Sequence, residues 1–449
     1  MRASTVFNRL LELPGIWVRD VRFEPKRVVV VAVLRSTSLH CPDCAYSTPN
    51  RESINHNDSV WRHLDLGARR LEIHIRLRRL RCPQHGALVE GVPFARADAR
   101  FTRPFEDVVA WLATKTDKTA VCRLMRIDWQ TVGRIIDRVG DELLPDDRLE
   151  GLVEISIDEV AWRKGHRYLT LVGDHSSGKI VWGTEGKGAA AADEFFAELD
   201  PGSAEEPPCP PPPAAERPHG QAEPLVEEQD ERQVAQRASK LTAVSMDMTG
   251  GYAKSVREHA PQAAIVIDNY HVVALASKAL DEVRREDWNA LRGSGQADAA
   301  KAFKDARWSL LKNPEDLTDR QADTLAALQA ASGKTARAWA MKEMVRAIFA
   351  SGLTAGDVAT LIDRLLSRLS RSRLKPFVRL GRTIRKHREG ILAARRLGLS
   401  NARAEALNNK VKLIVRRAYG FHSARAALAL VHLTCGPVTL TLPFERAPA

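Results

Sequence analysis

Apolar positions recur with two different periods along the chain, and the change of period separates its regions. Residues 71–78 alternate between apolar and polar side chains, which predicts a β-strand with one buried face and one basic face. From about 101 to 144 the apolar residues recur at helical spacing instead, beginning with Val108, Val109, Trp111 and Leu112. The pattern therefore predicts a β-rich N-terminal part followed by a helical one.

The helical region contains a break near Ile127 and Asp128 that predicts two short helices within Thr119–Val139. Apolar residues on the two sides of the break would pack together: Val121, Leu124 and Met125 against Val132, Ile135 and Ile136. This layout is typical of a helix-turn-helix whose second helix begins near Gln130 and presents Gln130, Thr131 and Arg134 to DNA. A plain helical hairpin between two domains would give the same pattern.

The next region reads as a sheet with interspersed helices. Its predicted elements are strands at Val153–Asp158, Arg167–Asp174 and Lys179–Thr184, a helix at 189–199, a strand at 241–247, a helix at 252–259 and a strand at 263–268. This is the element order of the ribonuclease H-like fold, an α/β sheet that places its chemistry at strand ends, where Asp158 and Asp247 both fall. The segment 201–239 is rich in Pro, Glu and Ala, so we expect a flexible inserted loop there.

The last third of the chain is predicted to be helical, with an insertion of packed helices at 276–397. In the helix at 401–420, one face is apolar and is formed by Leu407, Val411, Ile414 and Ala418. Another face carries Asn401, Glu405, Asn408, Lys412 and Arg416. Glu405 on this face could hold a metal ion near phosphates, or could simply be solvated.

Composition and charge narrow the function classes. The chain has 449 residues, 44% of them hydrophobic, and a net charge of +12, which suits two to four globular domains whose basic surface binds a polyanion. It has no apolar run of the roughly 18 residues that a membrane span needs. The N-terminus also lacks the features of a secretory signal, so we expect a cytosolic protein without a membrane partner.

Four Cys and His side chains, of the types that bind metal ions, form two closely spaced pairs in the sequence. Cys41 and Cys44 lie in CPDC, and Cys82 and His85 lie in CPQH. Two short turns that each present two N or S ligands supply the four that tetrahedral zinc requires. Zinc is therefore expected here, although both pairs could be ordinary turn residues. The basic face of the intervening strand could contact phosphates or merely be solvated.

These motifs occur within longer stretches that resemble the ISL3 family of bacterial insertion-sequence transposases over nearly the whole chain. The similar stretches are CPDC with RLRCPQH, SIDEVAWRKGHRYLTLVGD, SMDMTGGYAKSVREHAPQAAIVIDNYHVV and LSNARAEALNNKVKLIVRRAYGFHSAR. The resemblance implies a zinc ribbon and a helix-turn-helix that bind terminal inverted repeats, followed by a DDE catalytic domain.

On this sequence the resemblance implies a catalytic triad of Asp158, Asp247 and Glu405 that binds Mg²⁺ or Mn²⁺. Asp268 and His271 match the D-x-x-H element of several such families, and Asp268 is the rival for the second acid because it too ends a strand. Three carboxylates provide the anionic oxygens that a two-metal phosphoryl transfer needs. Lys412 and Arg416 are candidates for contacts to the DNA backbone.

The resulting prediction is a multidomain α/β transposase. Its expected parts are a zinc ribbon at 1–98, a helix-turn-helix at 99–148, a ribonuclease H-like core at 149–275, a large all-helical insertion at 276–397, and the Glu405 helix with the C-terminal end of the core at 398–449. Double-stranded DNA is the expected partner, with a homodimer or higher assembly on DNA in the bacterial cytoplasm, associated with the nucleoid.

Two other classes of protein remain open from the residues alone. A zinc-ribbon and helix-turn-helix regulator derived from a transposase but without catalysis would have no reason to keep all three acids. A ribonuclease H-like nuclease acting on RNA or on repair intermediates would keep the acids but would hardly need both DNA-binding modules.

Overall fold

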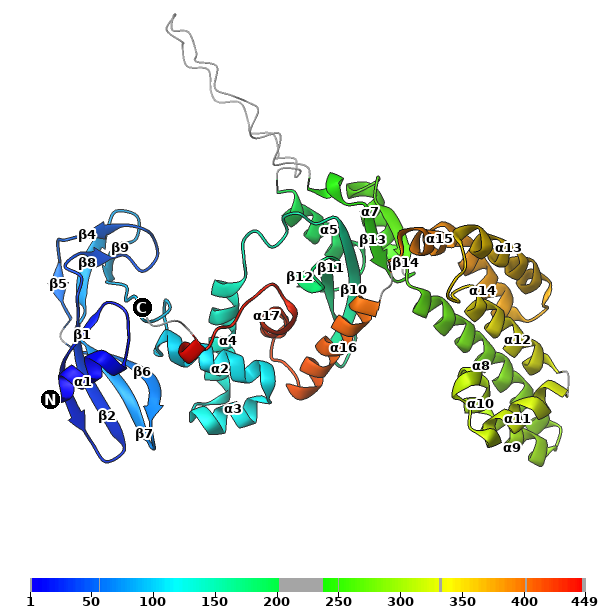
Figure 1. Ribbon diagram of the computed structural model, residues 1–449, viewed down its shortest axis with the longest axis horizontal. Coiled ribbons are helices and arrows are strands. Elements are labelled where there is room, and N and C mark those ends of the chain that lie inside the picture. The colour runs from blue at the N-terminus through cyan, green and yellow to red at the C-terminus, as the bar shows by residue number, and fades with distance from the viewer. Residues whose placement is uncertain are drawn as a thin grey trace, which may run out of the picture. The chain divides into compact units, whose positions relative to one another are not determined.

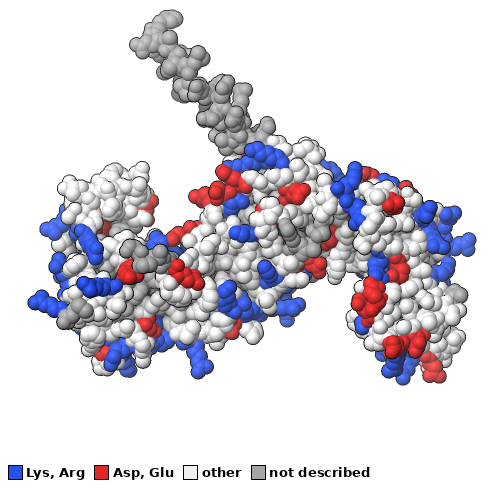
Figure 2. Space-filling view, viewed as in Figure 1, with Lys and Arg blue, Asp and Glu red and all other residues white. Residues whose placement is uncertain are grey.

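The computed structural model describes residues 2–55, 57–201, 237–248, 250–330, 333–399 and 402–445 (Figure 1). Its internal contacts divide the chain into two compact units, Met1–Asp146 with Leu413–Ala449, and Asp147–Lys412. Lys and Arg side chains are spread over the visible surface of both units, with acidic side chains among them (Figure 2). The predicted loop at 201–239 lies outside the described residues except at its two ends.

The first unit begins with helix α1 (Ala3–Leu10) and a four-stranded sheet. Its strands are β1 (Ile16–Phe23), β2 (Arg27–Leu34), β6 (Ser59–Leu66) and β7 (Arg69–Ile75), in the order β1-β2-β7-β6. The predicted burial of Leu71, Ile73, Ile75 and Leu77 is confirmed. The predicted strand at 71–78 is too long, because β7 ends at Ile75 and Leu77 lies in the connection to β8. Five short strands form two further small sheets: β3 (Leu39–His40), β4 (Ser47–Thr48), β5 (Ser53–Ile54), β8 (Arg78–Cys82) and β9 (Gly86–Val89).

Helices α2 (Arg103–Lys115), α3 (Lys118–Met125) and α4 (Trp129–Leu143) follow in the same unit. The predicted break between α3 and α4 is confirmed, and Asp128 caps α4 by accepting a hydrogen bond from the backbone N–H of Thr131. The predicted packing holds for Val121, Met125, Val132, Ile135 and Ile136, which are buried. It is wrong for Leu124, which is 64% exposed because it lies on the outer face of the short helix α3.

Helix α17 (Ala424–Cys435) packs against α2 and α4. The sequence led us to expect the whole of 398–449 to complete the core of the second unit. Instead, the contacts from Leu413 onward belong to the first unit, since α17 buries a face of Ala and Leu side chains on α2 and α4. The first unit is therefore built from both ends of the chain.

The second unit contains a five-stranded mixed sheet in the order β12-β11-β10-β13-β14. Its elements are β10 (Glu154–Arg163), β11 (Arg167–Asp174), β12 (Lys179–Glu185), α5 (Ala189–Leu199), β13 (Ala243–Met246), α7 (Gly250–His259) and β14 (Ala264–Ile267), which is the predicted element order. Strands β10, β13 and β14 are parallel to one another. Asp158 was expected to end its strand, but β10 continues to Arg163 because it forms a long antiparallel hairpin with β11.

The helical insertion follows the sheet. Its helices are α8 (Asn269–Gly293), α9 (Ala297–Asp305), α10 (Arg307–Leu311), α11 (Asp319–Ala330), α12 (Lys334–Ala347), α13 (Ala355–Arg371), α14 (Lys375–Lys386) and α15 (Arg388–Leu397). Helix α15 covers the edge strand β14, where a Cβ at Gly390 would lie only 2.6 Å from a side-chain carbon of Ile267. Glycine at this position therefore permits the close packing. None of the described helices is long and apolar enough to cross a membrane.

His63 is a buried titratable group within the first unit. It lies on β6, is 8% exposed, and its Nδ1 hydrogen-bonds Thr102 Oγ1 at 2.7 Å. Burial lowers the pKa of His63 from about 6.5 to about 4, because the charged ring would lose its hydration. The folded state therefore holds this imidazole neutral over a pH range in which the unfolded chain takes up a proton.

We expect this group to make the first unit less stable in acid. The contribution of neutral His63 is fully present above pH 6.5 and is lost as the pH falls toward 4, by about 3 kcal/mol at most. His63→Asn, which keeps a hydrogen-bonding group near the ring Nδ1, should flatten this part of the pH profile. Hydrogen exchange of β6 and β7 peptides in urea measures the effect, with exposed His166→Asn as the control.

The wild type and the His63→Asn variant both keep the Cys and His side chains of the predicted zinc site. Any effect of acid on that site is therefore the same in both proteins. Equal pH profiles for the wild type and His63→Asn would contradict the prediction.

Candidate functional site

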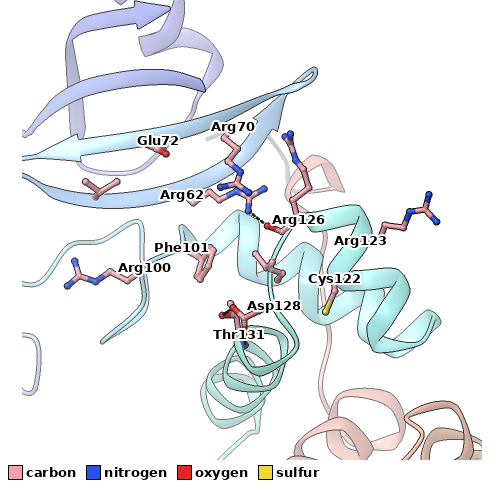
Figure 3. Close-up of a pocket in the computed structure, with 12 residues that line it drawn as sticks. Arg62, Arg70, Glu72, Arg100, Phe101, Cys122, Arg123, Arg126, Asp128 and Thr131 are labelled. Carbon is pink, nitrogen blue, oxygen red and sulfur yellow. Dashed lines mark hydrogen bonds between the residues drawn. The ribbon is translucent and has the colours of Figure 1, made fainter. Parts of the chain in front are cut away.

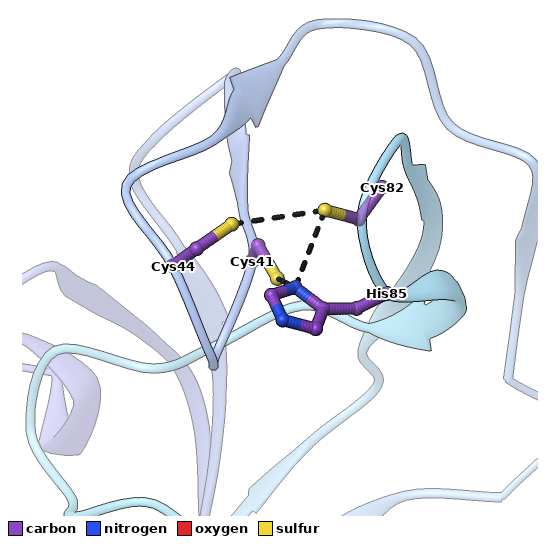
Figure 4. Close-up of side chains that lie close together, drawn as sticks. All are labelled: Cys41, Cys44, Cys82 and His85. Atoms are coloured by element: carbon purple, nitrogen blue, oxygen red, sulfur yellow. Dashed lines mark hydrogen bonds between the residues drawn. The ribbon is translucent and has the colours of Figure 1, made fainter. Parts of the chain in front are cut away.

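Cys41, Cys44, Cys82 and His85 converge as the spacing predicted (Figure 4). Cys41 follows β3, Cys82 ends β8, and the other two side chains lie in the turns that follow. Sγ of Cys44 and Sγ of Cys82 are 3.7 Å apart, and His85 Nδ1 is 3.6 Å from the sulfurs of Cys41 and Cys82. Tetrahedral zinc with ordinary bond lengths separates its ligands by about 3.8 Å for two sulfurs and about 3.6 Å for sulfur and nitrogen. The donor set therefore fits a tetrahedral metal ion.

The chemistry of Cys82 also favours a metal. Burial by itself would raise the pKa of this thiol, but hydrogen bonds from the backbone N–H groups of His85 and Gln84, together with those to the His85 and Cys44 side chains, lower the pKa to about 6. Thiolate is the form of cysteine that binds metals. The turn that presents Cys82 thus also stabilises its metal-binding form.

The helix-turn-helix presents two of its three predicted DNA-binding side chains freely. Gln130 and Arg134 are exposed, and Arg134 donates a 3.3 Å hydrogen bond to the Gln130 amide oxygen. Thr131 is half-buried, and its hydroxyl donates to the carboxylate of the cap residue Asp128 at 2.5 Å. Thr131 therefore also stabilises the start of α4.

In the second unit, acidic side chains gather at one edge of the sheet. Ile157 of β10 pairs with Met246 of β13, so Asp158 and Asp247 are the next residues on two neighbouring parallel strands. Met246 also pairs with Ile267 of β14, so Asp268 follows in the same register. The topology places all three carboxylates where the parallel pairing ends.

Asp158 is held in place from two directions. The backbone N–H of Glu159 donates to its Oδ1 at 2.7 Å, and the Asn408 amide donates to its Oδ2. Burial raises the pKa of the Asp158 carboxyl, and the two hydrogen bonds oppose that rise. The negative charge of Asp247 also raises the pKa of Asp158, because two nearby carboxylates repel each other electrostatically.

His271 lies between the other two acids. Its Nδ1 is 3.2 Å from Asp247 Oδ1 and 3.5 Å from Asp268 Oδ2. The Asp268 carboxylate also accepts a 3.0 Å hydrogen bond from the backbone N–H of Tyr270, so it caps helix α8. Asp268 therefore caps α8, whereas Asp247 accepts a hydrogen bond from the backbone N–H of Met248 at 2.5 Å.

Glu405 lies on α16 (Ala402–Arg417), one turn before Asn408, and its side chain is exposed. Among the described residues, three or more His, Cys, Asp or Glu side chains bring their ligand atoms within 4.8 Å of one another only in the cluster of Cys41, Cys44, Cys82 and His85. Strand register relates Asp158 to Asp247, and Glu405 is related to Asp158 through Asn408 on the same helix. Lys412 and Arg416 are exposed further along α16.

Two residues near the acids escaped the sequence analysis. Asn408 was placed only on the polar face of its helix, although its spacing of three residues from Glu405 was a usable signal. His387, in the helical insertion, is close enough for the charge of Asp247 to oppose the burial that lowers the pKa of this histidine. No local pattern could have identified His387, because a fold in three dimensions brings it there.

Comparison with known proteins gives matches over most of the chain. A family model described as "Transposase", of the DDE type in ISL3 elements, matches residues 155–206 and 219–430. A second model, "Helix-turn-helix domain of transposase family ISL3", matches residues 90–140. The latter covers α2, α3 and most of α4.

Two curated relatives also extend over most of the chain. One is "Transposase for insertion sequence element IS1557" from Mycobacterium tuberculosis, which is 38% identical over 85% of this chain and 83% of its own length. The other is "Transposase for insertion sequence element IS1001" from Bordetella parapertussis, which is 26% identical over 80% of each chain.

Proposed function

The chain belongs to the ISL3 family of transposases, and from this premise we propose that it binds the terminal inverted repeats of an insertion sequence and then cuts and joins DNA there in a metal-dependent reaction. The observation that carries the catalytic part is the placement of Asp158 and Asp247 side by side where β10 and β13 stop pairing. The sheet order β12-β11-β10-β13-β14 supports a ribonuclease H-like fold for this unit.

The catalytic acids in this proposal are Asp158, Asp247 and Glu405. Their carboxylate oxygens suit the hard cations Mg²⁺ and Mn²⁺. Burial, with a smaller effect from the charge of Asp247, raises the pKa of Asp158, so a bound cation would favour the charged form of this carboxylate. Bound metal would activate the attacking oxygen and stabilise the leaving one. We choose Asp247 over Asp268 because β13 pairs directly with β10, so Asp247 follows the strand next to the one that carries Asp158, whereas Asp268 follows β14, one strand further away.

The remaining residues position these acids. Asn408 fixes the orientation of Asp158 by donating to its Oδ2, and it anchors the helix that carries Glu405. His271 lies with its Nδ1 between the carboxylates of Asp247 and Asp268 and so helps to position both. Water would attack the phosphodiester at the element end and break its P–O3′ bond, which frees a 3′-OH and leaves a 5′-phosphate. This 3′-OH would then attack a phosphodiester of target DNA and displace a target 3′-OH, so no protein nucleophile is needed.

The first unit supplies recognition in the same proposal. Gln130, Thr131 and Arg134 on α4 would contact the inverted repeat, while Lys412 and Arg416 on α16 would contact the DNA backbone. Zinc would join the Cys and His ligands and stabilise the small sheets around them. We place the reaction in the bacterial cytoplasm on nucleoid DNA, by a homodimer or a higher assembly.

We expect Asp158→Asn, Asp247→Asn and Glu405→Gln each to abolish cleavage of duplexes made from the DNA that flanks the gene. Each change keeps the size of the side chain but removes one negative charge from the metal site. Gel analysis of cleavage with Mg²⁺ and with EDTA measures the effect.

Glu159→Gln and Asp174→Asn are the matched controls and should be mild. Glu159 follows Asp158 on β10 and so belongs to the opposite face of the sheet, and Asp174 accepts hydrogen bonds in the β11–β12 turn. Zinc content and DNA binding should survive in every variant. If Asp247→Asn remained active and Asp268→Asn were inactive, the second catalytic acid would be Asp268, which follows β14, and not Asp247. Normal cleavage by all the variants would overturn the mechanism.

A second expectation concerns the pH dependence of cleavage. The Asn408 hydrogen bond lowers the pKa of Asp158, so Asn408→Leu should let burial raise that pKa further. The carboxylate would then lose its charge at a higher pH, and the acid limb of the cleavage profile should move upward. Exposed Asn409→Leu on the same helix is the control and should leave the limb in place. Identical limbs for all three proteins would exclude this role for Asn408.

A third expectation concerns zinc. Elemental analysis should find one zinc ion per chain, and Cys44→Ser should lose it, because four ligands are needed for tight tetrahedral binding. Hydrogen exchange should then increase in the small sheets around the site, since metal binding there contributes folding energy. Cys122→Ser, outside the cluster, should retain the ion. A wild-type protein that folds fully without metal would count against this assignment.

A further inference from the structure

A groove of about 980 Å³ lies in the first unit between the β6–β7 hairpin and the helix-turn-helix (Figure 3). Five arginines line it: Arg62, Arg70, Arg100, Arg123 and Arg126. Glu72 and Asp128 also line it, but Glu72 pairs with Arg27 at 3.0 Å and Asp128 caps α4. The groove therefore presents an excess of positive charge.

Three of these arginines are available to a ligand. Arg70, Arg100 and Arg123 are exposed and, among the residues that the structure describes, form no ion pair. Arg69 precedes Arg70 in the hairpin. It is also exposed and forms no ion pair with any residue that the structure describes. Guanidinium groups without a protein partner at an open groove suit phosphate oxygens.

The other two arginines fix the hairpin to the helix-turn-helix. Asp65 lies where the β6–β7 register is irregular and accepts hydrogen bonds from Arg62 at 3.2 Å and from Arg126 Nε at 2.9 Å. Arg126 ends α3 in the left-handed conformation, with φ of 54°, and donates to the Ala68 carbonyl at the hairpin tip. Arg62 in turn donates to the Arg126 carbonyl at 2.9 Å.

Backbone pairing strengthens this connection. The Arg62 N–H donates to the Arg100 carbonyl at 2.9 Å, and the Thr102 N–H donates to the Arg62 carbonyl at 3.0 Å. The outer edge of β6 is thereby bonded to the segment that leads into α2. The hairpin itself turns through two residues, with Gly67 at φ of +59°, a conformation that glycine adopts without strain. These hydrogen bonds thus fix the position of the hairpin relative to α3.

We propose that the β6–β7 hairpin is a second DNA-contacting element, which holds phosphates of the duplex next to the stretch that α4 reads. The inference rests on the proposed binding of DNA by the helix-turn-helix and adds a separate contact to it. Arg69 and Arg70 bind the phosphates. Asp65 positions the hairpin through Arg62 and Arg126 without touching DNA.

Binding of the full-length protein to duplexes from the flanks of the gene tests this proposal. Arg69→Ala with Arg70→Ala should weaken binding about tenfold or more at physiological salt, and should reduce the slope of log affinity against log salt by about two, because each arginine neutralises one phosphate. A hydroxyl-radical footprint should lose one protected patch and keep the patch protected by α4.

Arg9→Ala with Arg19→Ala is the matched control, because it removes the same charge from exposed positions of the same unit that lie outside the β6–β7 hairpin. Within the described part of the chain these two arginines also form no ion pair. This control pair should leave the footprint unchanged.

Asp65→Asn separates position from charge. This change makes the protein more basic, so charge alone predicts tighter binding, whereas release of Arg62 and Arg126 from the carboxylate predicts a weaker hairpin patch. Hydrogen exchange in α4 and unchanged zinc content would show that the unit is still folded. A fully protected hairpin patch in this variant would overturn the positioning role.

The outcomes distinguish this proposal from the one on which it rests. No binding by the unchanged protein would overturn both the proposed recognition of the flanks and the hairpin contact. Binding and footprints that Arg69→Ala with Arg70→Ala leaves equal to the control pair would overturn the hairpin contact alone.

Discussion

The contact between Asn408 and Asp158 joins side chains that are 250 residues apart in sequence, and it fixes α16 to the strand that carries Asp158. A carboxylate that is partly buried in a sheet needs hydrogen-bond donors, because its own hydration has been removed. The Glu159 N–H provides one of these donors locally, and the second comes from α16, after the whole helical insertion. The insertion can thus be long, provided that its exit helix returns to the same edge of the sheet.

Because α16 returns to the sheet only after the helical insertion, the structure fixes Glu405 in a different way from Asp158 and Asp247. Asp158 and Asp247 are fixed by strand pairing, which leaves little freedom in their separation. Glu405 is fixed only through the helix that Asn408 anchors, and its carboxylate is exposed. A side chain on a helix surface can change rotamer at small cost, whereas a side chain within a sheet edge cannot. Among the three acids that we propose for catalysis, Glu405 is therefore the one whose side chain can most readily change its rotamer.

Local patterns predicted what local physics determines. The break at Asp128 follows from helix capping, the convergence of Cys41 and Cys82 from ligand spacing, and the element order of the sheet from changes of period. The strand containing Asp158 was predicted too short, because its pairing with β11 is a tertiary property. The exposure of Leu124, the position of His387 and the placement of α17 all depend on which elements meet, and a single sequence carries no local signal for that.

The placement of α17 has a consequence for synthesis of the protein. Ala427 and Val431 of this helix are fully buried in the first unit, against helices that leave the ribosome about 300 residues earlier. A nascent chain can form the sheets and the helix-turn-helix early, but the apolar surface of α2 and α4 stays uncovered until translation is nearly complete. Copies of the gene that end prematurely lack this cover as well. An intact reading frame is therefore required for the N-terminal module to reach its full stability, even though that module is encoded first.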